Sequence, residues 1–101
     1  MVVTPLQVIQ HGNLKVMAEE LSTQAVKLRQ RAELAWHNAV FFEDAAKEWP
    51  AKFRQEAELA WDNAVFFEDA AKQSEEQADH AVHLLAEFEE MIAQGPPPAT
   101  P

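Results

Sequence analysis

The chain has 101 residues, with two glycines, six prolines and no cysteine. A chain of this length forms one domain at most, and the lack of thiols excludes a disulfide framework and a thiolate metal site. The formal net charge is −9, so nucleic-acid phosphates and anionic lipids would repel the protein. We therefore expect no nucleic-acid partner and no membrane contact.

The N-terminal region lacks a basic stretch followed by an apolar core, and no run of 18 apolar residues occurs in the chain. These features argue against a conventional secretory signal and a transmembrane helix. The expected location is the cytoplasm, and export without a conventional signal peptide is left open.

The first twelve residues (1–12) are expected to form a short N-terminal lead-in. Thr4 before Pro5 is a typical N-cap and first-turn pair, and Gly12 favours a helix end, so residues 5–11 are predicted to form a brief helix. Asn13 can then cap the next helix.

Two long helices are predicted, over residues 13–48 and 51–94. Pro50 disfavours helix at the residue before it and clashes with the preceding turn, so it marks a boundary. The predicted fold is all-α, a long antiparallel helical hairpin over residues 13–94. The alternative is one long helix kinked at Pro50. Gly95 and the prolines that follow end the second helix, and residues 95–101 are expected to be a flexible, Pro-rich tail.

An internal repeat lies at the centre of the chain. Residues 32–47 recur as residues 57–72 with one change, His37 to Asp62, at an offset of 25 residues. This offset is close to seven turns of an α-helix, so both copies present the same faces. Such near-identity indicates a recent or an engineered duplication.

Alanines recur every seven residues along both helices. Small residues at this spacing let helix backbones approach closely, which favours antiparallel pairs and tight bundles. The predicted close-packed seam consists of Ala18, Ala25, Ala32, Ala39, Ala46, Ala57, Ala64, Ala71 and Ala78.

The repeat carries more apolar surface than one seam can cover. A helix that is apolar around most of its circumference needs more than one neighbour, and a two-helix hairpin supplies one. We therefore expect assembly into a multi-helix bundle, as a homo-oligomer or with a protein partner. The predicted assembly interface consists of Trp36, Val40, Phe41, Phe42, Trp49, Trp61, Val65, Phe66 and Phe67.

Four polar residues of the second helix have spacing that could hold a divalent metal. Glu76, His80, His83 and Glu87 fall on one helix face. The same stripe continues the acidic outer face of the helix, and we favour this solvated face over a metal site. No cofactor is expected. The sequence also has no nucleophile constellation and no glycine-rich phosphate loop, so enzymatic activity is not expected.

The chain resembles the small Trp-x-Gly helical-hairpin proteins of type VII secretion in its length, its two helices and its central tryptophan. Trp49-Pro50-Ala51 stands where that family has Trp-x-Gly, so the glycine is missing, as is the C-terminal Tyr-x-x-x-Asp/Glu signal. The resemblance implies a secreted hairpin. A bundle that carries an apolar ligand is a further alternative. The favoured function is a non-enzymatic self-assembling scaffold or interaction subunit.

Overall fold

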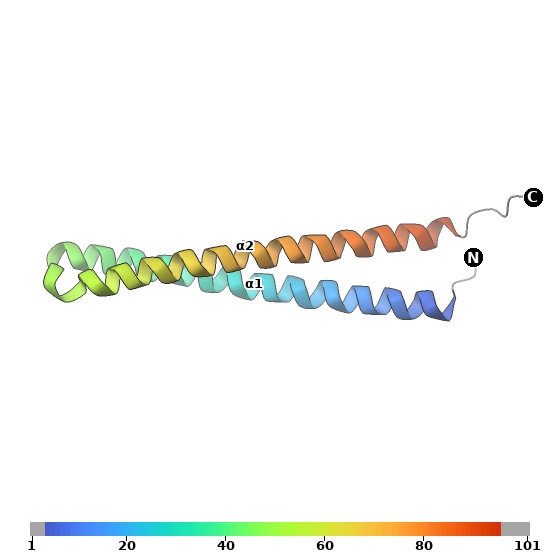
Figure 1. The fold of residues 1–101 in the computed structure, drawn as a ribbon, viewed down its shortest axis with the longest axis horizontal. Helices are drawn as coiled ribbons and strands as arrows, with labels where there is room; N and C mark the ends of the chain where they lie inside the picture. The colour runs from blue at the N-terminus through green and yellow to red at the C-terminus, as the bar shows by residue number, and fades with distance from the viewer. Residues whose placement is uncertain (1–3, 96–101) are drawn as a thin grey trace, which may run out of the picture.

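The computed structural model describes residues 4–95 and consists of two helices, α1 (Pro5–Glu48) and α2 (Pro50–Gln94). The helices run antiparallel, so that the start of α1 and the end of α2 lie at the same end of the molecule (Figure 1). The predicted helical hairpin is confirmed, and the alternative of one kinked helix is wrong. None of the described helices is long and apolar enough to cross a membrane.

The turn between the helices contains a single residue, Trp49, which caps both of them. Its N–H donates to the Ala45 carbonyl at 2.8 Å, and its own carbonyl accepts from Lys52 and Phe53 at 3.1 and 3.0 Å. Pro50 takes the first position of α2, where a backbone N–H has no partner within the helix. The proline therefore starts a helix here instead of bending one.

Helix α1 begins at Pro5 instead of residue 13, which corrects the predicted lead-in helix with its stop at Gly12. Thr4 and Gln7 form a capping box, in which the Gln7 N–H donates to Thr4 Oγ1 at 3.1 Å and the Thr4 N–H donates to Gln7 Oε1 at 3.0 Å. Gly12 lies within the helix, and the positive φ that a glycine stop would need is found at Gly95 instead.

Contacts between the seam face of α1 and helix α2 explain why α1 continues through Gly12. Gln7 and His11 stand seven residues before Leu14 and Ala18, so they extend the same face of the helix toward α2. The His11 ring stacks on Phe88 with a centroid distance of 6.4 Å. Contacts with α2 thus offset the roughly 1 kcal/mol that a glycine costs inside a helix.

The C-terminal end follows the prediction at Gly95, whose φ of 75° lies in the positive range that glycine adopts most easily. Its N–H donates to the Ile92 carbonyl at 3.1 Å. The rest of the predicted flexible tail, residues 96–101, lies outside the described residues.

The buried side chains within residues 4–95 are small. They are Ala18, Ala25, Ala32, Ala35, Ala39, Ala57, Ala64, Ala71, Ser74, Ala78 and Ala81. The radius of gyration is 22.5 Å, against about 13 Å for a compact domain of this length. The hairpin is therefore a thin rod with one close-packed seam, and the other sides of both helices stay uncovered.

Candidate assembly interface

Of the nine predicted seam alanines, Ala46 is half-buried and the other eight are buried. Ala39 of α1 and Ala64 of α2 have no exposed surface and share one cluster with Ala35. The small side chains allow the two backbones to lie close together over the repeat.

Trp36 and Trp61, predicted to face a partner, contact each other within the hairpin. Their ring centroids are 5.3 Å apart at an interplanar angle of 69°, and both rings pack against the alanine cluster. An edge-to-face arrangement of this kind stabilises an aromatic pair beyond the area it buries. Both tryptophans are half-buried, so their first role is to hold α1 against α2.

The other predicted interface residues divide into half-buried and exposed groups. Phe42 and Phe67 are half-buried, and each is packed edge-on by the preceding phenylalanine at 5.4 and 5.5 Å. The remaining five are exposed: Val40 by 49%, Phe41 by 65%, Trp49 by 62%, Val65 by 50% and Phe66 by 66%. Equivalent positions of the two copies differ by one percentage point, so the copies have the same surroundings.

The sequence similarity extends beyond the near-identical block, to residues 27–47 and 52–72. Within these 21 positions three differ, namely Leu28/Phe53, Arg31/Glu56 and His37/Asp62. Because α1 and α2 are antiparallel, the copies are related by an approximate two-fold axis perpendicular to the hairpin, which passes between Trp36 and Trp61. The duplicated helix therefore packs against its own copy, much as the subunits of a two-fold dimer do.

A groove of about 400 Å³ lies between the helices over the two copies. Its lining consists of five repeat-related pairs, each separated by 25 residues: Arg31/Glu56, Leu34/Leu59, Ala35/Ala60, Asn38/Asn63 and Phe42/Phe67. Leu34 and Leu59 are exposed by 65% and 58%. The approximate two-fold axis therefore passes through a largely apolar groove with an asparagine on either side.

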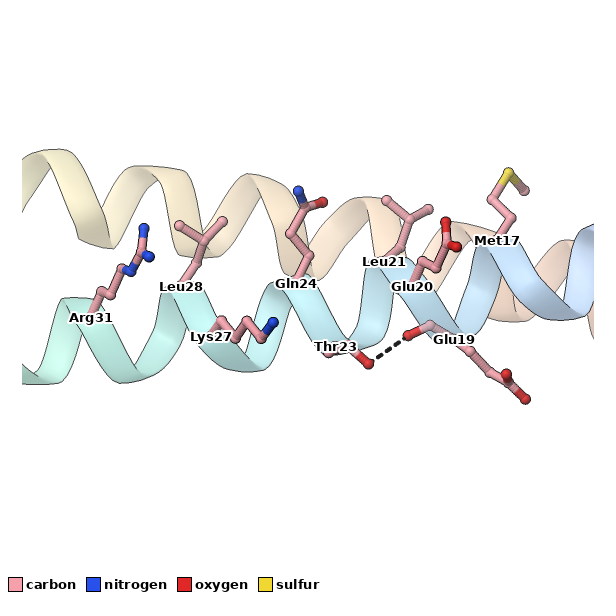
Figure 2. A pocket seen from close by; sticks show the side chains of 9 residues that line it. All are labelled: Met17, Glu19, Glu20, Leu21, Thr23, Gln24, Lys27, Leu28 and Arg31. Atoms are coloured by element: carbon pink, nitrogen blue, oxygen red, sulfur yellow. Dashed lines mark hydrogen bonds between the residues drawn. The ribbon is translucent and has the colours of Figure 1, made fainter.

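The groove continues along α1 into a hollow of about 700 Å³, and Arg31 lines both. Figure 2 shows this hollow, in which Leu21, Gln24 and Leu28 project from the same side of α1. Thr23 points away from them, and its hydroxyl donates to the Glu19 carbonyl at 2.9 Å. The surface that the groove opens onto thus extends beyond the repeat toward the N-terminal half of α1.

An ion-pair network joins the helices on the side of the hairpin away from the groove. Arg29 donates through Nε and Nη2 to the Glu75 carboxylate at 3.2 and 2.6 Å, and through Nη1 to Glu68 at 2.6 Å. Glu68 also accepts from Trp36 Nε1 at 3.3 Å. This network was not predicted, although the seven-residue spacing places Arg29, Glu68 and Glu75 beside the seam, where it could have been found.

The Arg29 guanidinium holds the pKa of Glu75 below its ordinary value through its hydrogen bonds and its charge. The same hydrogen bonds, with Glu75 first and Glu68 next, raise the already high pKa of Arg29. A bidentate guanidinium–carboxylate contact has a fixed geometry, so this network favours the register of α1 against α2 in which Arg29 reaches both carboxylates.

The residues considered for metal binding do not converge on one point. His83 Nε2 lies 3.0 Å from Glu87 Oε1 on an exposed face. In the described part of the chain, no three histidine or carboxylate side chains come close enough to share an ion.

Comparisons of the chain with protein-family models, with curated proteins and with solved structures found no match.

Proposed function

We propose that this protein is a non-enzymatic helical subunit that associates with further copies of itself to form a multi-helix bundle. The observation that carries the proposal is the exposure of the repeat's large apolar side chains. Phe41 and Phe66 are about two-thirds exposed, although the seam on the other side of each helix is fully formed.

The exposed area is large for a protein of this size. A phenylalanine buries about 150–250 Å² when it is covered, so Phe41 and Phe66 together leave roughly 200–300 Å² of ring surface in water. Leu34 and Leu59 extend this surface across the groove. The total falls in the range of about 300–600 Å² at which a monomer's largest apolar patch is often functional.

The shape of the hairpin adds a second argument. Its accessible surface is 7848 Å², whereas a compact monomer of 11.4 kDa exposes about 5,800 Å². No side chain larger than alanine is fully buried within residues 4–95. Because two helices alone cannot form a core of large side chains, docking of further helices would supply one.

Size-exclusion chromatography with light scattering tests the proposal, since light scattering gives a mass that does not depend on the rod shape. We expect a mass of two or more copies of the 11.4 kDa chain at micromolar concentration, with dissociation on dilution. A monomer mass over the whole range from about 1 to 100 µM, concentrations near typical affinities, would refute self-association.

A further inference from the structure

The charges of the hairpin are unevenly distributed around its seam. We define the groove face as the positions that recur every seven residues from Leu34 and Asn38 in α1 and from Leu59 and Asn63 in α2. This face holds three basic and four acidic side chains, a net charge of −1, and the rest of the chain holds five basic and thirteen acidic ones, a net charge of −8.

This distribution distinguishes two apolar surfaces that are otherwise similar. Val40 and Val65 are half-exposed on the opposite side. That face, taken every seven residues from Trp36 and Val40 and from Trp61 and Val65, holds five basic and eight acidic side chains, a net charge of −3. Copies of an acidic protein repel each other at close range. The groove face is therefore the side on which a second copy meets less repulsion.

The groove is also suited to a copy of itself by its symmetry. Its lining repeats from α1 to α2, so either helix of a second hairpin meets nearly the same surface. Apolar side chains occupy the outer positions, Leu34 and Phe41 in α1 and Leu59 and Phe66 in α2. The amides of Asn38 and Asn63, beside the approximate two-fold axis, can donate to and accept from the same amides of a partner.

The charges of the two helices determine which helix faces which. Helix α1 carries five basic and six acidic side chains, whereas α2 carries three and eleven. Because of the approximate symmetry, the shape of the groove accepts α1 on either partner helix. Placing α1 over the partner's α2 keeps the two acidic α2 helices on a diagonal of the bundle, where their repulsion is weaker.

We infer that a second copy of this chain docks on the groove face to form a two-fold four-helix bundle in which both turns lie at the same end. This inference rests on the proposed function and specifies its partner, surface and orientation. In this arrangement Phe41 stands within about one helical turn of Leu59 in the second copy, and Phe66 stands equally close to Leu34. The phenylalanines then become the large side chains of the shared core.

Two matched double variants test which face is used. Leu34→Glu with Leu59→Glu places charges on the groove face, and Val40→Glu with Val65→Glu places the same charges on the opposite face. In 0.15 M NaCl, where repulsion between distant charges is screened, we expect the leucine pair to associate at least tenfold more weakly than the wild type, and the valine pair to associate as the wild type does. All four side chains are exposed, so circular dichroism should show unchanged helix content in both variants.

The outcomes separate this inference from the proposed function. If wild-type protein associates and the leucine pair also associates, or if the valine pair alone dissociates, the groove face is excluded while self-association stands. If wild-type protein is a monomer throughout, both fail. Loss of helix content in the leucine pair would be resolved with Leu34→Ser and Leu59→Ser, for which the same weakened association is expected.

The orientation is tested by measuring the distance between two spin labels, one in each copy of the chain. Each label is attached to an introduced cysteine, which is the only one in the chain because the sequence has no cysteine. Val16→Cys lies near the open end of the hairpin, at an exposed position outside the groove face. With both turns at one end, the two labels are roughly 30 Å apart; with opposite turns they are more than about 50 Å apart, at 1.5 Å per residue. A long distance would overturn the proposed orientation.

Discussion

Ser74 is the only polar side chain that is buried among residues 4–95, and it lies beside the seam alanines, seven residues from both Phe67 and Ala81. Its side chain is 5% exposed, and its Oγ has no hydrogen-bond partner within this range. A buried hydroxyl without a partner costs about 1–3 kcal/mol, and alanine fits the same space. Ser74 therefore lowers the stability of the seam.

We expect Ser74→Ala to raise the free energy of unfolding by about 1 kcal/mol, measured by urea denaturation at one protein concentration. Ser22→Ala is the matched control, because Ser22 is a half-buried serine within α1 and gives the same gain in helix propensity. Equal effects of the two variants would show that the Ser74 hydroxyl finds a partner in solution.

The Arg29 network predicts a pH dependence. The folded-state pKa of Glu75 is lowered by Arg29, so the contact stabilises the hairpin above the ordinary carboxyl pKa. This stabilisation disappears as the pH falls through the lowered folded-state value, because protonated Glu75 no longer attracts the guanidinium. Arg29 itself stays charged throughout.

Arg29→Gln should therefore lower the melting temperature at pH 7 and have much less effect at pH 2, as followed by circular dichroism. Arg54→Gln is the control. Arg54 is the repeat equivalent of Arg29, is exposed, and makes no ion pair with the described residues. If Arg29→Gln lowers the melting temperature equally at both pH values, the Arg29 side chain stabilises the hairpin through its packing and not through its charge.

Helix α1 continues through Gly12, where the sequence predicted a helix end, and a substitution tests this continuity. A Cβ at Gly12 would meet no atom within 4 Å, and its φ is not positive. Gly12→Ala should therefore stabilise the protein by about 0.5–1 kcal/mol. If Gly12 instead ended a helix with a positive φ, the same substitution would destabilise it.

Much of the fold follows from the seven-residue spacing of alanine, because small side chains at that spacing define one face of each helix. The spacing favoured an antiparallel pair, and Pro50 marked the boundary between its helices. Of the ten alanines that are buried among residues 4–95, eight belong to the predicted seam, and Ala35 and Ala81 were not part of it.

The spacing did not predict the start of α1, because local signals at Gly12 and Asn13 compete with tertiary contacts of His11. These contacts depend on α2, which is far away in the sequence.

The candidate interface was predicted less completely than the fold. The excess of apolar surface around the helices of the repeat identified Phe41 and Phe66, which are exposed, together with Trp36 and Trp61, which are half-buried against each other. The antiparallel arrangement brings the two copies of the repeat face to face, so each tryptophan finds its equivalent within the hairpin. The groove is lined by residues of both helices. It could therefore not be predicted from the pattern of either helix alone.

The two descriptions of the molecule, an acidic rod and a self-associating one, conflict because like charges oppose association. Most carboxylates lie away from the groove face, but the whole chain still carries a net charge of −9. Each copy therefore repels the other over a range set by the ionic strength. Salt shortens that range, from a Debye length of about 30 Å at 0.01 M to about 8 Å at 0.15 M.

We expect association to strengthen with salt, with a dissociation constant at least several-fold lower in 0.15 M than in 0.01 M NaCl, because the repulsion is screened while the apolar contacts remain. Sedimentation velocity over a dilution series measures this constant. Association through ion pairs between the copies, or with a basic partner, would weaken in salt instead. The Val40→Glu/Val65→Glu variant adds charge outside the groove face, so its association should depend on salt more steeply than that of the wild type.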